Sequence, residues 1–587
     1  MLARASRSAS RLLAVQAAPV MTGARTIVFE PRYGEIDVPD LSVTDYLLEN
    51  AHKFGDKPAL IDGLSGRSIK YSELSTRIGS AAQTLVDRGF GPDKVSACAR
   101  SADPLPASRK PRLWSARKPS GAGSGWAPQT ADARELRGTL GIHLPNIPEY
   151  IVAFNAAGVA GGRVTTSSPL ATASELAHQL RDSSTSTVVT LPAFRETVEA
   201  AAEEAGCVKE VAYVGEESGA FLFEDRGIEA KTIDSFKPDD CFALPYSSGT
   251  TGLPKGTMLS HRNLVANVQQ IVQHPEHNLD MTESDVVLGL LPAYHIYAMT
   301  VVCQAALRQG ASVVMLPKFE PQPFLEVLQK YGVTWAPLVP PLILFLAKHP
   351  VVDSADLSKL RVIFSGAAPL DAGTQSAVEK RLDVSVRQGY GMTELSPVSH
   401  FTHPKHNVSG SVGFLAPSCY SKIIDPDTKE ELGYGEEGEL CVKGPNVMLG
   451  YLNNDKATQE TILPDGFLRT GDIARVEENG HTFIVDRLKE LIKVKGMQVA
   501  PAELEGLILE CPGVADAAVV PVLHERDGER PKAFVVRAEG EAGEAATEEA
   551  VRNAVASKTS AYKHLHEVVF IDHIPKSAAG KILRRML

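Results

Sequence analysis

Several features are scarce in this 587-residue chain, and each scarcity excludes a class of protein. Positive charge is short, because 60 Lys and Arg residues face 71 Asp and Glu residues and leave a net charge of -11. Nucleic-acid-binding domains usually carry a basic face, so we expect no nucleic-acid partner. Cysteine is sparse, with 7 residues and no CxxC pair, which indicates reduced thiols in an intracellular compartment and not a disulfide framework.

Long apolar runs are also rare, although residues 286–307 form one that contains no Asp, Glu, Lys or Arg and is long enough to cross a membrane. Pro292, Tyr294, His295 and Tyr297 interrupt this run near its middle. A buried strand, a turn and a buried helix account for that pattern better than a membrane-spanning helix does. We therefore expect a chain without a transmembrane span.

The first residues differ in composition from the rest of the chain. Four arginines and three serines precede the first acidic residue, Glu30. Segments rich in Arg and Ser and poor in acidic residues are typical of mitochondrial transit peptides. We predict such a peptide over residues 1–28 and a mitochondrial location, with a cytoplasmic or peroxisomal location as the alternatives.

Helical and strand patterns alternate along most of the chain. Residues 71–89 place apolar side chains at helical spacing and end at Gly89, and a continuous apolar run such as 312–317 follows a helical stretch. Apolar strands between helices indicate a sheet that is buried on both faces. The sequence therefore predicts an α/β core, and a composition shift near 487–490 predicts a domain boundary there.

Residues 96–140 break this alternation. They are rich in Pro, Gly, Ser and Arg and show almost no aliphatic periodicity, so they cannot bury enough apolar surface to fold by themselves. The sequences on either side read as one strand running into a loop when they are joined. We interpret 96–140 as a retained intron in the gene model or as a disordered insert that interrupts a core strand.

The sequence YSSGTTGLPKG, residues 246–256, carries a strong local signal. Glycines let backbone N–H groups approach an anion closely, and hydroxyls and one lysine add donors, which is the chemistry of a phosphate-binding loop. The spacing differs from the Walker A motif GxxxxGK[ST], because Pro254 precedes the lysine and Gly256 follows it. The candidate phosphate-binding residues are Ser247, Ser248, Gly249, Thr250, Thr251, Gly252 and Lys255.

Five further motifs follow this loop along the chain. They are SGAAP (365–369), QGYGMTE (388–394), RTGD (469–472), DRLKELIKVKG (486–496) and PKSAAGK (575–581). This ordered set resembles the adenylate-forming superfamily, which includes acyl-CoA synthetases, 4-coumarate–CoA ligases, luciferases and peptide-synthetase adenylation domains. The resemblance covers residues 40–587 apart from the insert, and HIYAM (295–299) looks closest to the 4-coumarate–CoA ligase and luciferase branch.

The resemblance implies a fold and a reaction. The fold would be a large N-terminal domain of stacked α/β sheets over 40–487, followed by a small mobile α+β lid at 488–587 that turns about Lys489. The reaction would use ATP and Mg²⁺ to convert a carboxylic acid into an acyl-adenylate, from which the thiol of coenzyme A displaces AMP. A carboxylate is a poor electrophile, and adenylation provides AMP as its leaving group.

The resemblance also implies roles for single residues. Thr393 would touch the α-phosphate, and Glu394 would hold Mg²⁺, a hard cation that suits carboxylate and phosphate oxygens. Asp472 would accept both ribose hydroxyls, and Arg487 would add a charged contact to the nucleotide. The ring of Tyr390 would stack on the adenine, and Gly391 would be a further nucleotide-binding residue. The residues expected to flank the adenine are Gly366, Ala367, Ala368, Gln388, Gly389 and Tyr390.

Different groups of the lid would serve the two half-reactions. Lys581 would contact the carboxylate and the α-phosphate during adenylation only, and a long-stemmed point charge suits that reach. After the lid has turned about Lys489, Lys493 and Gln498 would serve the transfer to coenzyme A.

The predicted acid pocket leaves the substrate open. By resemblance, His295 lies beside the reacting carboxylate and Tyr297 lines the pocket, whose other candidates are Thr300, Phe364 and Leu395. Thr300 and Phe364 replace the Asn and Lys that are usual in plant 4-coumarate–CoA ligases, which removes polar contacts for a ring hydroxyl.

We predict a 4-coumarate–CoA ligase-like enzyme that acts on a small carboxylic acid. No Asp or Glu occurs between 286 and 319, which argues against an amino-acid substrate, since its ammonium group would need an acidic partner. The alternatives are a medium- or long-chain fatty acyl-CoA synthetase, a luciferase-like oxygenase and an inactive remnant. The sequence predicts no oligomeric state.

Overall fold

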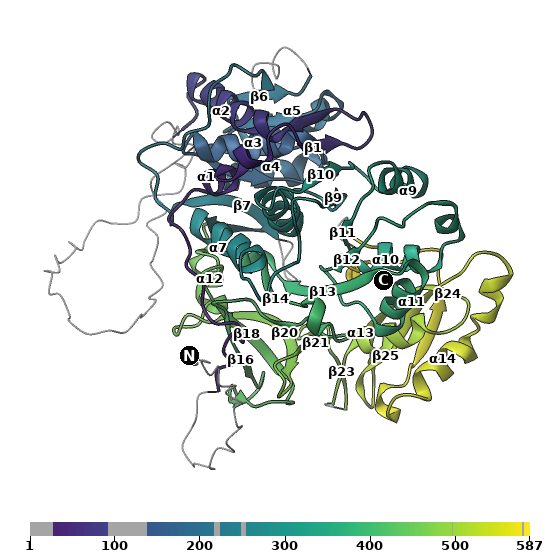
Figure 1. The fold of residues 1–587 in the computed structure, drawn as a ribbon. Coiled ribbons are helices and arrows are strands. Elements are labelled where there is room, and N and C mark those ends of the chain that lie inside the picture. Colours follow the sequence, from purple (N-terminus) through teal and green to yellow (C-terminus); the bar gives the residue numbers. More distant parts are fainter. Residues whose placement is uncertain (1–26, 92–137, 216–222, 248–253, 496, 578–579) are drawn as a thin grey trace, which may run out of the picture.

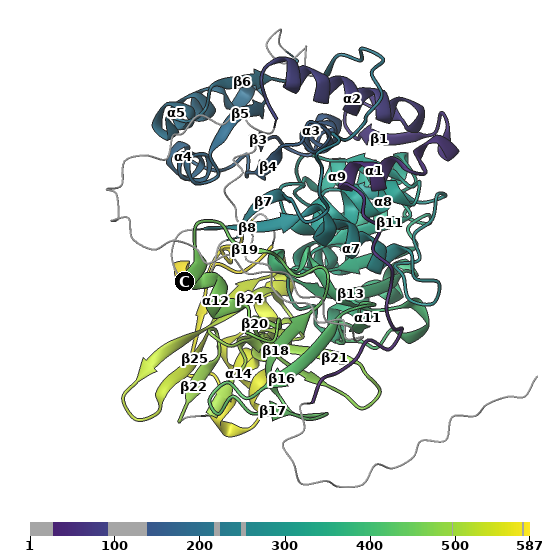
Figure 2. The same ribbon diagram turned by 90° about the vertical axis from the view of Figure 1, so that its left-hand side faces the viewer.

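The computed structural model describes residues 27–91, 138–215, 223–247, 254–495, 497–577 and 580–587. Figures 1 and 2 show a large domain and, in yellow, a smaller C-terminal lid beside the end of the large domain that carries β20 (Leu468–Val476) and β21 (Thr482–Arg487). The mixed α/β class predicted from the sequence is confirmed.

Two large sheets, mostly of parallel strands, build the interior of the large domain. The seven-stranded sheet has the spatial order β19 (Gly450–Tyr451), β8 (Lys255–Ser260), β7 (Cys241–Ser247), β4 (Arg163–Thr166), β3 (Thr139–His143), β5 (Thr185–Thr190) and β6 (Glu210–Tyr213). The nine-stranded sheet has the order β15 (Phe414–Leu415), β14 (Val398–Phe401), β13 (Ser385–Gly391), β12 (Val362–Ser365), β11 (Trp335–Leu338), β9 (Val286–Gly289), β10 (Ser312–Met315), β1 (Pro58–Asp62) and β2 (Ser68–Lys70).

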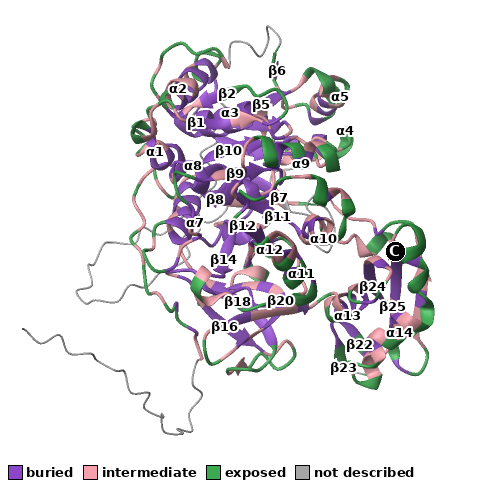
Figure 3. Cartoon of the chain, turned by 45° about the vertical axis from the view of Figure 1, so that its right-hand side comes forward, coloured by how far each residue is buried: buried purple, intermediate pink, exposed green. Residues whose placement is uncertain are grey.

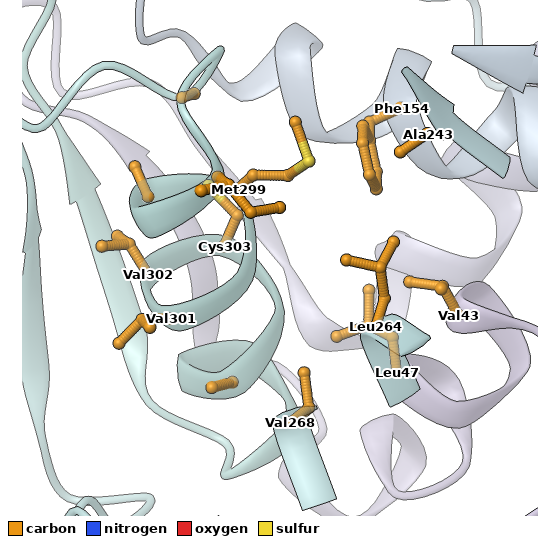
Figure 4. Close-up of a cluster of buried hydrophobic side chains, with 14 of the residues drawn as sticks. Val43, Leu47, Phe154, Ala243, Leu264, Val268, Met299, Val301, Val302 and Cys303 are labelled. Carbon is orange, nitrogen blue, oxygen red and sulfur yellow. The ribbon is translucent and has the colours of Figure 1, made fainter. Parts of the chain in front are cut away.

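A layer of buried helices lies between these two sheets. All twelve residues of α3 (Pro148–Val159) are buried, including Glu149, which pairs with Arg67, so this helix has no solvent-facing side. Figure 4 shows side chains of α1 (Val43–Leu48), α3, α7 (His261–Val272) and the π-helix η3 (Ala298–Ala305) converging in this layer with Ala243 of β7. Other α-helices in the described part of the large domain are α2 (Tyr71–Asp87), α4 (Ala173–Asp182), α5 (Arg195–Ala205), α8 (Ala306–Arg308), α9 (Pro321–Lys330), α10 (Pro340–Lys348), α11 (Ala372–Leu382) and α12 (Asp455–Thr461).

An antiparallel sheet and the lid complete the molecule. The antiparallel sheet has the order β17 (Glu431–Leu432), β16 (Tyr420–Ile424), β18 (Gly438–Lys443), β20 and β21. β21 ends at Arg487, a turn follows at 488–490, and the lid begins with β22 (Ile492–Val494). The lid strands are β23 (Met497–Val499), β22, β25 (Gly528–Arg537), β24 (Val514–His524) and β26 (Glu567–Phe570), with α13 (Pro501–Leu509) and α14 (Glu548–Ala556).

The structure confirms several expectations about single elements. The apolar run 286–307 forms β9, a turn and the buried π-helix η3, as predicted. The helix expected over 71–89 is α2, and the apolar run 312–317 contains β10. Among the described residues, no helix has both the length and the apolar character needed to cross a bilayer.

The predicted end of the insert needs correction, and most of the predicted transit peptide lies outside the described residues. β3 begins at Thr139, so the last residues of the predicted insert 96–140 belong to the core sheet, where all of β3 is buried; residues 96–137 lie outside the described part of the chain. Of the predicted transit peptide, residues 1–26 also lie outside it, whereas Ile27 already donates its backbone N–H to Glu431 at 2.7 Å.

Candidate active site

The predicted nucleotide-binding residues lie where β12 and β13 end, and packing there requires glycine. A Cβ added to Gly389 would lie 2.8 Å from the ring of Phe364, and one added to Gly391 would lie 2.1 Å from the carbonyl oxygen of Pro397. Neither position can hold a side chain without displacing the neighbouring strand or ring. Glycine is therefore required at both positions by the packing of the strand end itself.

The turn after β12 holds the next predicted group, Gly366, Ala367 and Ala368. A Cβ at Gly366 would lie 2.8 Å from the ring of Tyr297, so this position is confined as well. Ala367 has a φ of +70°, a left-handed conformation that costs a non-glycine residue about 1–2 kcal/mol. Strain of this kind, in a residue that is exposed at a strand end, is characteristic of ligand-binding turns.

Gln388 differs from its neighbours because its polar groups are used within the protein. Its side-chain Nε2 donates to Gln375 Oε1 at 3.1 Å, and its backbone N–H donates to Thr402 Oγ1 at 2.9 Å. The side chain of Gln388 therefore supports β13, and the place of this residue beside the adenine stays a prediction.

A buried carboxylate connects three of the predicted residues. Tyr390 donates its hydroxyl to Asp472 Oδ2 at 2.6 Å, and Arg487 Nε lies 3.2 Å from Asp472 Oδ1. Asp472 and Arg487 are cross-strand partners on β20 and β21, and Asp472 is only 5% exposed. Burial raises the pKa of Asp472, while Arg487 and Tyr390 oppose that shift. Both oxygens of the carboxylate are thus held in fixed directions, as a pair of neighbouring hydroxyl donors would require.

A second buried carboxylate, Glu394, lies near the lysine of the glycine-rich loop. Glu394, in the short turn η5 (Thr393–Leu395), accepts a hydrogen bond from the Tyr451 hydroxyl at 2.8 Å. Lys255 Nζ lies 4.9 Å from the centre of the same tyrosine ring, so Tyr451 connects the lysine of the glycine-rich loop to Glu394. Thr393 immediately precedes this carboxylate at the start of η5.

The donor set at Glu394 suits a magnesium ion that arrives with a nucleotide. Mg²⁺ is commonly held by one or two carboxylates together with substrate phosphates, and not by a cage made entirely of protein groups. Among the residues that the structure describes, no group of three or more His, Cys, Asp or Glu side chains could hold a metal. Glu394 therefore fits as the single protein ligand, with phosphate oxygens supplying further ligands.

Lys581 reaches the same region from the lid. It lies directly beside the bridge between Lys576 and Ile582 that closes a hairpin, and its backbone N–H donates to Ser577 Oγ at 3.2 Å. A Cβ at Gly580 would lie 3.0 Å from Val339, so the hairpin packs directly on the large domain.

Lys581 interacts electrostatically with several ionisable groups of the large domain. Desolvation and the nearby Arg487 guanidinium lower the pKa of Lys581, whereas Asp472 and Glu394 raise it. Lys581 nevertheless remains accessible to solvent. Burial lowers the pKa of His295 to about 4, and Lys581 contributes to that shift. Lys581 thus interacts electrostatically with the two carboxylates, Arg487 and His295, which are the groups that the resemblance assigns to adenylation.

The predicted acid-pocket residues are mostly buried. Tyr297 donates its hydroxyl to the carbonyl oxygen of Phe364 at 2.9 Å, and burial raises the pKa of Tyr297. The ring of Phe364 is enclosed, stacked on Trp335 with ring centres 5.4 Å apart and covered by Gly389.

Two further pocket candidates are inaccessible from outside. Thr300 and Leu395 are both fully buried, and the hydroxyl of Thr300 has no hydrogen-bond partner among the residues that the structure describes.

The structure does not bring Lys493 and Gln498 to Lys581. They face each other across β22 and β23, are exposed, and belong to the hairpin that Figure 3 shows at the lower edge of the lid. Lys489 lies in the turn at 488–490 between β21 and the lid.

The glycine-rich loop is described only at its two ends. Ser247 ends β7 and pairs with Lys255 at the start of β8, so the loop joins two antiparallel strands. Its predicted phosphate-binding members Ser248, Gly249, Thr250, Thr251 and Gly252 lie outside the described residues.

Tyr451 is the site residue that sequence reasoning missed. It lies 57 positions after its partner Glu394, in a stretch without a recognisable motif. The sequence offered no sign of a contact between the two regions.

Comparisons with known proteins agree with this geometry. Residues 137–452 match the model of the AMP-binding enzyme family, and residues 503–581 match that of the AMP-binding enzyme C-terminal domain. The chain is 37% identical over 572 residues to 4-coumarate–CoA ligase 1 of Petroselinum crispum and 38% identical over 571 residues to 4-coumarate–CoA ligase 1 of Solanum tuberosum, with 96% of each chain covered in both cases. The solved structure of ATP-bound MatB from Rhodopseudomonas palustris is 28% identical with a TM-score of 0.76, over 93% of this chain and 98% of that one.

The chain therefore belongs to the AMP-binding enzyme family. Within this family it is an AMP-forming acid–thiol ligase, and the similarity to 4-coumarate–CoA ligases favours that branch over the fatty acyl-CoA synthetase and luciferase-like alternatives.

Proposed function

We propose that Lys581 and the two buried carboxylates carry the first half-reaction, in which ATP converts a carboxylic acid into an acyl-adenylate and pyrophosphate. The attack brings one anion onto another, so fixed positive charge lowers its barrier. Lys581 supplies that charge between the acid and the α-phosphate, Asp472 holds the ribose hydroxyls, and Arg487 fixes Asp472. The observations that support this assignment are the packing of Gly580, next to Lys581, on Val339 of the large domain and the electrostatic effect of Lys581 on the pKa values of Asp472 and His295.

The nucleotide phosphates would lie at the end of the site that carries Lys255 and Glu394. Glu394 would hold Mg²⁺, which neutralises phosphate charge when it is bound, and Thr393 would donate its hydroxyl to the α-phosphate. Tyr451 keeps the Glu394 carboxylate in place through its hydroxyl. Lys255 would balance the charge of the β- and γ-phosphates.

The second half-reaction requires the lid to turn. Lys493 and Gln498 lie away from Lys581 in this structure and would enter the site only after rotation about Lys489. Withdrawal of Lys581 would then open the way for the thiol of coenzyme A, whose sulfur attacks the acyl carbon while AMP leaves with the bonding electrons.

The acid that fits the comparisons best is of the hydroxycinnamate class. The curated relatives quoted above are 4-coumarate–CoA ligases, and the stretch 286–319, which carries Tyr297, lacks acidic residues. Thr300 and Phe364 replace the Asn and Lys that are usual in those enzymes, and both are buried in this structure, so neither offers a polar contact to a ring hydroxyl. We therefore expect cinnamates with few ring hydroxyls to be preferred over more polar ones.

Acid-dependent exchange of labelled pyrophosphate into ATP, measured without coenzyme A, tests the proposal directly. We expect exchange with cinnamate or 4-coumarate that disappears when Mg²⁺ is chelated. Exchange that does not depend on any acid would contradict an adenylating function.

We further propose that residues 1–28 direct the protein to mitochondria, on the ground of their arginine-rich, acid-free composition. A fusion of residues 1–28 to a fluorescent protein should be imported, whereas a fusion in which its arginines are replaced by glutamines should remain outside. Import that is indifferent to the arginines would contradict the assignment.

A further inference from the structure

The first helix of the lid, α13, lacks a helix cap of its own. Its N-cap residue is Ala500, which offers no side-chain hydrogen bond, and Pro501 occupies the first helical position. The backbone N–H of Ala502 is therefore one of the first-turn donors that a helix leaves without an internal partner. An acceptor must come from elsewhere in the protein.

That acceptor is Asp486, which belongs to the large domain. Asp486 lies on β21, before the turn at 488–490, and its Oδ2 accepts the N–H of Ala502 at 2.9 Å. Its Oδ1 accepts the N–H of Arg487 at 2.7 Å. A negative charge at a helix N-terminus is favoured by the helix dipole, so the large domain supplies both the hydrogen bond and the charge that α13 needs.

The other end of α13 is held by a cation of the large domain. Lys348, the last residue of α10, donates from Nζ to the carbonyl oxygens of Leu509 at 3.3 Å and Val514 at 3.4 Å. A cation near a helix C-terminus is again the favourable arrangement. Asp486 and Lys348 thus hold α13 at its two ends with opposite charges.

The same helix is connected to the hairpin that carries Lys581. Glu505 of α13 accepts a hydrogen bond from Arg584 Nη2 at 2.9 Å, and Arg584 lies three residues after Lys581. Arg584 Nε also lies 3.5 Å from Glu490 in the turn that joins the two domains. The orientation of α13 therefore determines where the Lys581 hairpin lies.

We infer that Asp486 and Lys348 are positioning residues that hold the lid in the orientation in which Lys581 enters the site. This inference rests on the proposed function, because it assigns that orientation to adenylation. Rotation about Lys489 must break both contacts, since each joins α13 to the large domain. The lid keeps its own buried core, so the two contacts are needed for its orientation and not for its folding.

The charged groups around Asp486 agree with this assignment. Burial raises the pKa of Asp486 to about 6, while the N–H groups of Ala502 and Arg487 and the charge of Arg584 oppose the shift, and Glu490 adds to it. Asp486 is thus ionised at neutral pH despite its burial, as the contact with a helix N-terminus requires.

The test compares the two half-reactions in full-length Asp486→Ala, Asp486→Asn and Lys348→Met variants. We expect acid-dependent ATP–pyrophosphate exchange to fall about 10-fold or more in Asp486→Ala and about 2- to 10-fold in Lys348→Met, in keeping with the worth of charged hydrogen bonds and helix-end charges. Thioester formation from a supplied acyl-adenylate should fall less than exchange does, or rise. Asp486→Asn keeps an acceptor oxygen without the charge, so its rate of pyrophosphate exchange should lie between those of wild type and Asp486→Ala.

Asp285→Asn is the matched control. Asp285 is also buried, accepts a backbone N–H from Thr282 at 2.8 Å and faces Arg361, but it lies next to β9 in the large domain. Any effect of this substitution on stability should change both half-reactions to the same extent. A changed ratio of the two half-reactions that appears in the Asp486 and Lys348 variants and is absent in Asp285→Asn is therefore diagnostic of lid orientation.

Amide hydrogen exchange over residues 500–510 gives a readout that does not depend on catalysis. Exchange at Ala502 should become faster in Asp486→Ala than in wild type. The inference would be overturned if Asp486→Ala lost both half-reactions equally, or if amide hydrogen exchange at Ala502 in that variant were unchanged. If instead wild-type protein catalyses neither half-reaction with any acid, the proposed function fails, while the exchange measurement still decides whether Asp486 holds α13.

Discussion

At the scale of single residues, Lys581 separates the two half-reactions. Replacing Lys581 by alanine should lower acid-dependent pyrophosphate exchange about 100-fold or more, because the fixed charge that stabilises the developing negative charge is lost. Thioester formation from a supplied acyl-adenylate should persist, since Lys581 is withdrawn in that step. Separate assays of the two steps provide the measurement.

Lys576→Ala is the control for that substitution. Lys576 lies in the same hairpin but pairs with Asp516 at 2.7 Å, away from the nucleotide residues. In the Lys576→Ala variant the rates of both half-reactions should stay within about two-fold of wild type, because ion pairs near the surface contribute little to stability. Loss of both half-reactions in Lys581→Ala would contradict the role in adenylation alone.

The pKa of His295 provides an independent measure of where Lys581 lies. Burial and the nearby Lys581 lower this pKa to about 4, so the imidazole is neutral at neutral pH. In the unfolded chain the imidazole takes up a proton near pH 6.5, so folding becomes less favourable as pH falls from about 6.5 towards 4. In Lys581→Ala the pKa of His295 should rise towards its ordinary value without reaching it, because burial remains. Titration of the histidine ring resonances by NMR provides the measurement.

His400 is the control for this titration. Burial alone lowers its pKa to about 3, so the Lys581→Ala substitution should leave it unchanged. An unchanged pKa of His295 in the same variant would show that the lysine is not close to it.

Residues with a chemical signature were predictable from the sequence, and residues defined by distant contacts were not. Asp472, Arg487 and Glu394 were identified because their motifs occur in order along the chain. Tyr451 and Asp486 act through contacts that no local pattern encodes, since one reaches a carboxylate 57 positions away and the other caps a helix across the domain boundary.

At the scale of elements, the start of β3 predicts that the inserted segment is dispensable. Gly138, directly before β3, donates its N–H to the carbonyl oxygen of Gly91 at 3.1 Å, so the chain leaves and returns at one place. Removing residues 96–137 would keep Gly138 and its hydrogen bonds and would leave four residues, 92–95, to join Gly91 to Gly138, which is enough, since each spans up to about 3.3–3.6 Å.

We expect this deletion variant to fold, with an unfolding temperature at least equal to that of the full chain and with pyrophosphate exchange retained. Calorimetry and the exchange assay provide the measurement. If the deletion variant were insoluble or inactive while the full-length protein was active, the segment would be required for folding or activity.

Periodicity predicted the buried strands and α2 well, because their apolar residues follow the spacing of one element. The π-helix η3 was predicted only as a buried helix, since all eight of its residues are buried and no periodicity distinguishes its wider turns. The boundary of the insert was misplaced at Thr139 and Leu140 because a short buried strand has no signal of its own at its first residues.

At the scale of the whole molecule, the two half-reactions need two lid orientations. Lys489→Pro should fix the turn at 488–490, because proline locks φ and the N–H of residue 489 has no backbone partner among the described residues to lose. Pyrophosphate exchange should persist and thioester formation should fall, the reverse of Lys581→Ala. Equal retention of both steps would contradict a rotation about Lys489.

The adenylating acid–thiol ligase activity is tested most directly by thioester formation across a panel of cinnamic, benzoic and C6–C18 fatty acids, with ATP, Mg²⁺ and coenzyme A present. Mass spectrometry of the products and release of pyrophosphate report the outcome together. We predict coenzyme A thioesters with one pyrophosphate released per thioester, and the highest turnover on a cinnamate. Folded protein that forms no thioester with any acid in the panel would contradict this activity.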